Sequence, residues 1–289
     1  MSVIESKTEL FTVAGTDTGD SGAGSGVVNS RKIVTTFERY IQPCLAEVLG
    51  CTLFIFVGCG SVIENAGVPG SIQPALAHGL ALAIVIAVLG EISGGHFNPA
   101  VSVSVCVSGG LDVILLGPYI LSQIVGGVTG AGLAKEYQVV KGVSAGSGSQ
   151  GRPVCDGAEA VYSIINYDSA AGGAFNVVKT SGNIGSAAVA EMVMTLFLSL
   201  VVCMGAVNGR TRTPLAPLCI GLTVTANILA GGSVSGGCMN PARAFGPAVM
   251  ANYWEYHWIY WVGPVAGALI TGSLVRLLFG DQKTRLVLK

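Results

Sequence analysis

The sequence has few charged residues. Asp, Glu, Lys and Arg make up 11% of the 289 residues, while 51% are hydrophobic, whereas soluble domains usually carry about 25% charged residues. This number of charged residues is too small to cover the surface of a soluble globular protein. Most of the surface is therefore expected to face lipid. The formal net charge of −1 and the lack of a basic stripe argue against binding to nucleic acid.

Groups that hold metals or form catalytic pairs are also scarce. The chain has three histidines, and none of its eight cysteines forms a Cys-x-x-Cys pair, so we expect no metal, no cofactor and no enzyme activity. Most of the cysteines stand in or beside apolar stretches, where they act as small packing residues: Cys44, Cys51, Cys59, Cys106, Cys203 and Cys219. Cys155, in a polar link, and Cys238 are the two that remain for chemistry.

Long apolar stretches occur six times. A membrane-spanning helix needs about 20 apolar residues, and the stretches cover approximately 41–63, 74–92, 111–134, 187–207, 214–232 and 257–279. Residues 1–36 are polar and lack the hydrophobic core of a signal peptide, so we expect them to form a disordered tail. We therefore expect an all-α membrane protein with six spans.

Basic residues set the orientation of the chain in the membrane. They cluster in residues 1–36, in the link near Arg210 and at the C-terminal end, which places both termini in the cytoplasm. The predicted organisation is a cytoplasmic tail 1–36, a channel domain 37–280 and a cytoplasmic tail 281–289. Within the channel domain, residues 37–134 and 187–280 are joined by a long, flexible extracellular loop, 135–186.

Residues 37–134 and 187–280 repeat one pattern. "SGGHFNPA" at 93–100 returns as "SGGCMNPA" at 235–242, and Gly79 and Gly221 each stand 19 residues before the Asn of their copy. Glu47 and Glu191 open the first span of each copy. Three spans per copy make the copies cross in opposite directions. This inverted repeat predicts a substrate path between the halves.

The repeated phrase predicts the start of a helix. Gly-Gly breaks the chain, Asn98 and Asn240 are favoured N-caps, and Pro99 and Pro241 suit a first helical turn. About ten apolar residues follow each Asn, which rise about 15 Å, or half a bilayer core. Two re-entrant half-helices therefore meet near the midplane, where irregular backbone is tolerated only if protein buries it or water lines it. A single such phrase could be a surface turn, but two matched copies favour a pore.

At these residues the chain resembles the aquaporin (major intrinsic protein) family over about 37–280. The resemblance rests on the boxes Asn98-Pro99-Ala100 and Asn240-Pro241-Ala242, on the Arg that follows the second box, and on the two glutamates. It implies the aquaporin fold, a homotetramer with one pore per subunit, and asparagine amides that donate hydrogen bonds to a passing molecule. Passage of water, ammonia and other small neutral solutes through the bilayer is the implied activity.

The resemblance also implies a four-residue selectivity filter. Counting from the boxes gives His78, Ile228, Gly237 and Arg243, where strict water channels have Phe and His at the first two positions. This combination resembles ammonia- and water-conducting members. We expect Arg243 to lie against backbone carbonyls and repel cations, although a lipid-facing arginine and a packed His78 remain alternatives.

Four further residues are assigned to the pore or to the re-entrant loops that form it. We expect Cys238 to be a pore-facing thiol that mercury blocks or peroxide oxidises, the alternative being a packed thiol. His96, its counterpart in the first copy, is expected to line the inner vestibule and to bond backbone carbonyls freed by the broken helix. Glu47 and Glu191 are expected to accept backbone N–H groups of the re-entrant loops.

The predicted function is a passive channel for water and small neutral solutes, notably ammonia, and also hydrogen peroxide and urea. A strict water-only channel is the first alternative. A secondary transporter would need an ionisable coupling site at the midplane, and a closed membrane-junction protein would not conduct. The plasma membrane is the expected location, and the mitochondrial inner membrane is the alternative.

Overall fold

The computed structural model describes residues 35–65, 70–146 and 184–281. In these ranges the chain is helical, without strands, and holds six helices long and apolar enough to cross a membrane: Phe37–Glu64, Ile72–Ser93, Val113–Glu136, Ile184–Val207, Ala216–Ser235 and Ile259–Phe279. All six predicted spans are confirmed. Most of the predicted tails, 1–36 and 281–289, and Cys155 lie outside the described residues.

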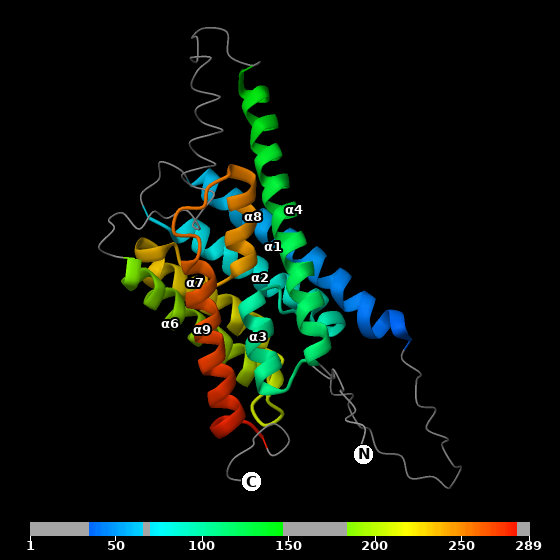
Figure 1. Ribbon diagram of the computed structural model, residues 1–289. Coiled ribbons are helices and arrows are strands. Elements are labelled where there is room, and N and C mark those ends of the chain that lie inside the picture. The colour runs from blue at the N-terminus through cyan, green and yellow to red at the C-terminus, as the bar shows by residue number, and fades with distance from the viewer. Residues whose placement is uncertain (1–34, 66–69, 147–183, 282–289) are drawn as a thin grey trace, which may run out of the picture.

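The first half contains α1 (Gln42–Glu64), preceded by the short η1 (Phe37–Ile41), then α2 (Ile72–Ser93), α3 (Pro99–Ser108) and α4 (Val113–Gly146). The second half contains α6 (Ile184–Val202) with η3 (Cys203–Val207), α7 (Ala216–Ser235), α8 (Pro241–Ala251) and α9 (Ile259–Leu274) with η4 (Val275–Phe279). In Figure 1 the N-terminal end of α1 and the C-terminal end of α9 both lie in the lower part of the bundle.

One predicted boundary differs from the structure. The long loop was expected to begin at residue 135, but α4 continues to Gly146, and α6 begins at Ile184. The added residues are more polar than the span before them, and a helix that has left the bilayer core can continue without an apolar sequence. Hydropathy measures where a helix leaves lipid, and not where the helix ends.

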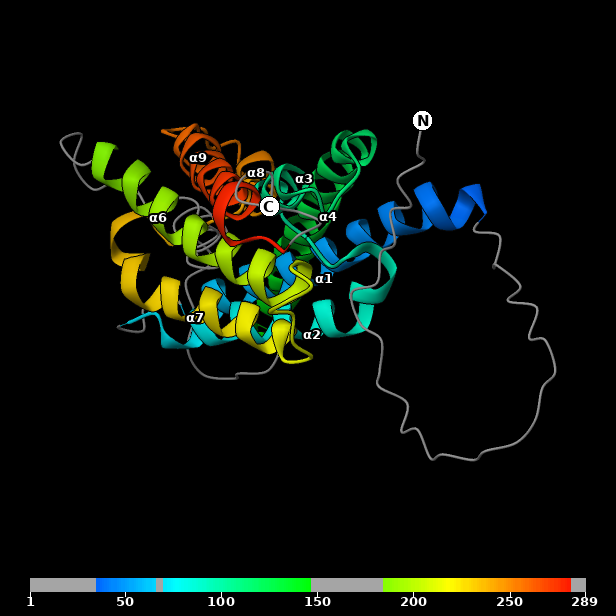
Figure 2. The same ribbon diagram turned by 90° about the horizontal axis from the view of Figure 1, so that it is seen from below.

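The short helices α3 and α8 are the predicted half-helices. Gly94 and Gly236 end the preceding spans in the left-handed conformation, with φ of 89° and 91°, which a residue without a Cβ adopts at little cost. Each half-helix then starts at a proline, directly after Asn98 or Asn240 as the N-cap. Seen from below, α3 and α8 lie between α4 and α9 (Figure 2).

Small residues let the long helices come close. At the crossing of α2 and α7, a Cβ on Gly79 would lie 2.5 Å from the carbonyl oxygen of Gly221, and a Cβ on Gly221 would collide with the carbonyl oxygen of Gly79. Gly126 and Gly130 of α4 approach the α1 backbone in the same way. The α2–α7 contact packs the two copies of the repeat against each other, and the α4–α1 contact closes the first half.

Candidate functional site

Asn98 and Asn240 cap the two half-helices with their side-chain oxygens. Oδ1 of Asn98 accepts hydrogen bonds from the backbone N–H groups of Ala100 and Val101, at 2.9 and 3.5 Å. Oδ1 of Asn240 accepts from Ala242 and Arg243, at 3.0 and 3.2 Å. The amide oxygens therefore belong to the helices, and only the amide nitrogens are available for other contacts.

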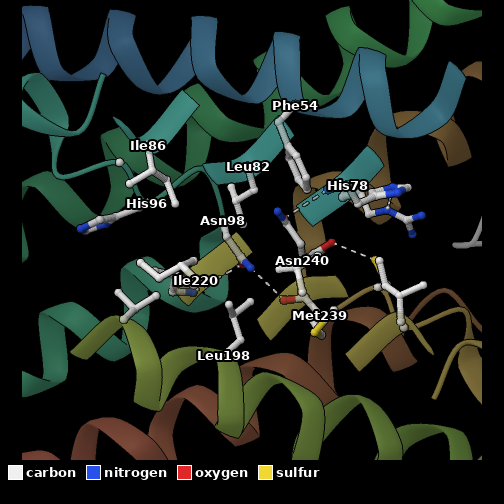
Figure 3. Close-up of a pocket in the computed structure, with 18 residues that line it drawn as sticks. Phe54, His78, Leu82, Ile86, His96, Asn98, Leu198, Ile220, Met239 and Asn240 are labelled. Carbon is white, nitrogen blue, oxygen red and sulfur yellow. Dashed lines mark hydrogen bonds between the residues drawn. The ribbon is translucent and has the colours of Figure 1, made fainter. Parts of the chain in front are cut away.

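Each amide nitrogen reaches across to the other half. Asn98 Nδ2 donates to the carbonyl oxygen of Met239 at 2.9 Å (Figure 3). Asn240 Nδ2 donates to the carbonyl oxygen of Phe97 at 2.8 Å. An amide nitrogen carries two hydrogens, and one of each pair is used in this way. The two half-helix starts are thus joined in the middle of the molecule.

Glu47 and Glu191 hold the re-entrant loops. The carboxylate of Glu47 accepts from the backbone N–H groups of His96 and Phe97, at 3.0 and 2.7 Å. Glu191 accepts from Cys238 and Met239, at 2.8 and 2.6 Å. Both carboxylates are fully buried, so each compensates the loss of water with hydrogen bonds from its own loop.

Sequence reasoning missed several residues that support these loops. The Tyr119 hydroxyl donates to the carbonyl oxygen of Ser93 at 2.7 Å, and the Tyr260 hydroxyl donates to that of Ser235 at 2.8 Å. Gln123 Nε2 donates to Glu47 at 2.7 Å. The tyrosines follow Asn98 and Asn240 by 21 and 20 residues, which was a readable signal. Gln123 could have been noticed as a polar side chain inside an apolar span.

A narrow cavity runs past the joined half-helices. Its polar lining includes Asn98 and Asn240, and its apolar lining comes from α2, α6 and α7, with Leu82, Ile86, Leu198, Val202, Ile220 and Val224. Figure 3 shows these two asparagines between the labelled apolar side chains. All four predicted filter residues also line this cavity: His78, Ile228, Gly237 and Arg243.

Arg243 binds the ring of His78, which the sequence did not predict. Arg243 Nε donates to His78 Nε2 at 3.1 Å, and His78 Nδ1 lies 2.7 Å from the carbonyl oxygen of Pro74. A carbonyl oxygen only accepts, so Nδ1 carries the proton and Nε2 presents its lone pair to the guanidinium. The expectation that Arg243 lies against backbone carbonyls was therefore incomplete: its Nε uses the neutral imidazole.

Gly237 and Ile228 form another side of the same cavity. Gly237 has φ of +61°, and a Cβ there would lie 3.1 Å from Cα of Ile228. A side chain at this position would therefore be strained by the backbone conformation and crowded by α7. The absence of a side chain on one side of the filter follows from the local fold.

The Cys238 thiol lines the cavity and also packs against the protein. Its Sγ donates to the carbonyl oxygen of Asn240 at 3.2 Å, and the residue clusters with Ala244 and Tyr260. The predicted pore-facing thiol and the packed alternative thus each describe part of its position. Only 3% of Cys238 is accessible, which limits the reagents that can reach it.

His96 has a different partner from the one expected. Its Nδ1 lies 3.1 Å from Oγ of Ser102, and its ring meets that of Tyr119 at a centroid distance of 5.3 Å. The ring therefore bonds a hydroxyl of α3, while the backbone N–H of His96 bonds Glu47. His96 does line the cavity.

Among the described residues, no group of three His, Cys, Asp or Glu could hold a metal.

The comparisons with known proteins agree with this geometry. The family described as "Major intrinsic protein" matches residues 34–275. The chain belongs to the major intrinsic protein family. It is 53% identical over 253 residues to "Aquaporin-8" of Mus musculus, covering 88% of each chain, and 51% identical to "Aquaporin-8" of Rattus norvegicus, covering 93% of each. The predicted resemblance is confirmed.

A solved structure supports the aquaporin fold. The aquaglyceroporin from Plasmodium falciparum superposes with a TM-score of 0.63 at 20% identity, covering 83% of this chain and 97% of that one. As a member of the major intrinsic protein family, the protein is an integral multi-pass membrane protein and a passive channel for water and small solutes.

Proposed function

We propose that this aquaporin-family channel conducts ammonia together with water, and that hydrogen peroxide and urea are further solutes of the same pore. The observation that supports this is the filter composition, in which Arg243 binds His78, Ile228 supplies an apolar wall and Gly237 supplies no side chain. Compared with a Phe and His filter, this ring has one aromatic ring instead of two and an apolar side chain at the Ile228 position, so it leaves more room. Neutral ammonia is a hydrogen-bond acceptor of about the size of water and suits such an opening.

The side chains of Asn98, Asn240 and Arg243 supply hydrogen-bond donors to the proposed path. One amide hydrogen each of Asn98 and Asn240 is bound across the loops, so the second hydrogen can contact a solute acceptor. Arg243 and the positive N-terminal ends of α3 and α8 favour electron-rich atoms and repel cations. Ammonia therefore passes, whereas ammonium does not.

Two alternative functions receive less support. A secondary transporter would need an ionisable coupling site near the midplane, and the carboxylates found there, Glu47 and Glu191, are bound to the loops of their own halves. A closed junction protein would give no excess water permeability in proteoliposomes. Flux with a low activation energy and no saturation is expected for the channel.

The test is to exchange the filter. In proteoliposomes the double substitution His78→Phe and Ile228→His is expected to keep water permeability within about twofold and to lower ammonia permeability about tenfold or more, because two rings instead of one narrow the opening and an imidazole replaces the apolar Ile228 wall. Stopped-flow scattering measures water, and internal pH measures ammonia. Retained ammonia flux contradicts the filter assignment, and equal loss of both contradicts its selectivity.

The assembly and orientation are part of the same proposal. We infer a homotetramer with one pore per subunit, in the plasma membrane, with both termini in the cytoplasm. The tetramer is implied by the family resemblance. The apolar exterior, which includes exposed Leu45, Leu49 and Leu53 on one face of α1, supports a lipid environment, and the charge distribution of the tails and short links supports the orientation. The subunit number can be measured by light scattering of the detergent-solubilised protein, and orientation by protease access to an N-terminal tag in sealed vesicles.

A further inference from the structure

Phe97 and Met239 occupy equivalent places in the two re-entrant loops but differ in where their side chains go. Both have positive φ, 47° and 54°. Both donate their N–H to the glutamate of their half, and both offer their carbonyl oxygen to the asparagine of the other half. Both side chains are buried, at 0% and 1% exposed, but Met239 belongs to the cavity lining and Phe97 does not. Figure 3 shows Met239 beside Asn240.

The residues on the first helix of each half explain the difference. The Phe97 ring lies over Gly50, where any Cβ would collide with it. Three residues after Glu191, at the place that Gly50 has after Glu47, stands Met194. Met194 is buried and its thioether lies close to Gly231 of α7. The pocket that accepts the Phe97 side chain is therefore filled in the second half, and Met239 stays at the cavity.

Asn227 of α7 binds the Met239 side chain. Its Nδ2 donates to Met239 Sδ at 3.0 Å and to the carbonyl oxygen of Met194 at 2.9 Å, so both amide hydrogens have acceptors. Asn227 is 7% exposed, and a buried amide within a membrane span needs such partners. At the corresponding place of the first half stands Val85, which cannot donate. The bond to a thioether thus belongs to the second half alone.

We propose that Asn227 is a positioning residue that fixes the Met239 thioether in the channel wall and so sets the size of neutral solute that passes the two asparagines. The inference rests on the proposed solute conduction. Methionine has three rotatable side-chain bonds and adapts its shape readily, so an unrestrained Met239 would sample several rotamers at a narrow point. When Asn227 binds the sulfur, Met239 stays in one rotamer, and the channel keeps one width at this point.

The flux test is a double-mutant cycle with Asn227→Leu and Met239→Leu. Met239→Leu keeps nearly the same volume and removes the sulfur acceptor. We expect Asn227→Leu to change the urea-to-water and ammonia-to-water permeability ratios by about three- to tenfold, and to change them no further in the Met239→Leu background. Thr223→Val is the matched control, because its hydroxyl bonds only Cys219 of its own helix among the contacts described, and should leave the ratios unchanged.

A second measurement does not depend on flux. The chain has six methionines, and ¹³C-methyl labelling with Met239→Leu as the assignment variant identifies the Met239 signal. In the wild type, the ¹³C chemical shift of the Met239 methyl group is expected at the value of a single rotamer. Asn227→Leu should move this shift to the average of several rotamers. An unchanged Met239 signal, or an Asn227→Leu flux effect that persists in the Met239→Leu background, overturns the inference. A wild type that conducts no solute beyond water contradicts the proposed function, while the methyl signal still decides the role of Asn227.

Discussion

The position of the His78 ring is set by a glycine on the neighbouring helix. A Cβ on Gly58 would lie 2.5 Å from His78 Nε2 and 2.7 Å from Cδ2, distances that real Cβ atoms do not show. Phe54, one turn earlier in α1, meets the same ring edge to face at a centroid distance of 5.9 Å. Because Nε2 is the atom that accepts from Arg243, a change in α1 can alter the filter without replacing any of its four residues.

Gly58→Ala is therefore expected to displace His78 from Arg243 and to change the ammonia-to-water permeability ratio by about threefold or more, the loss of one hydrogen bond to a charged group being worth about 1.5–3 kcal/mol. The matched control is Gly60→Ala, since a Cβ at Gly60 meets nothing within 4 Å in the part of the chain that the structure describes. Both variants are measured in the same proteoliposome assay. Equal ratios for the two would show that the His78 position does not influence selectivity.

At the scale of helices, the sequence predicted the half-helices because local chemistry decides them. Gly-Gly, Asn and Pro act within a few residues to stop one helix and start the next, and α3 and α8 begin at Pro99 and Pro241 as expected. The bond between His78 and Arg243 joins residues 165 apart in the chain. The family resemblance placed both residues in one filter, but a direct bond between them depends on how the helices pack, which composition and spacing do not encode.

The segment between α8 and α9 gathers aromatic side chains around His257. Trp261 Nε1 donates to His257 Nε2 at 3.1 Å, and the Trp254 ring lies 5.1 Å from the imidazole, centroid to centroid. Burial lowers the pKa of His257 below its ordinary value. A lowered pKa means that the neutral form is favoured in the folded state, so this contribution to stability is present near neutral pH and is lost as the pH falls through the lowered pKa.

The three tryptophans of the chain, Trp254, Trp258 and Trp261, all stand in or next to this segment, so tryptophan fluorescence reports on it. Acid titration is expected to show one transition with a midpoint below the ordinary histidine value of about 6.5, because protonated Nε2 can no longer accept from Trp261. His257→Gln should remove the transition. A midpoint at or above that value would contradict the assigned environment.

At the scale of the whole molecule, the last helix of each half holds the half-helix of the other. Arg276 Nη1 donates to the carbonyl oxygen of Ser108, at the end of α3, at 3.3 Å. Lys135 Nζ donates to the carbonyl oxygen of Met250, near the end of α8, at 2.9 Å. The two cations are 141 residues apart, close to the 142 that separate Asn98 and Asn240, so they are equivalent positions of the inverted repeat.

A cation at a helix C-terminus opposes the negative end of the helix dipole and is worth about 0.3–1 kcal/mol, or up to about 2 kcal/mol when partly buried. Lys135→Met and Arg276→Met are therefore each expected to lower the melting temperature of the detergent-solubilised channel by about 2–4 °C, and the two effects should add because they act at opposite ends of the pore. Lys135→Arg and Arg276→Lys keep the charge and should retain most of the stability. If the conservative variants lower the melting temperature as much as the methionine variants, the shape of the side chains and not their charge accounts for the stabilisation. If only one of the two methionine variants is destabilised, Lys135 and Arg276 do not contribute equally to stability. The inverted repeat would then describe the pore but not the stabilisation of α3 and α8.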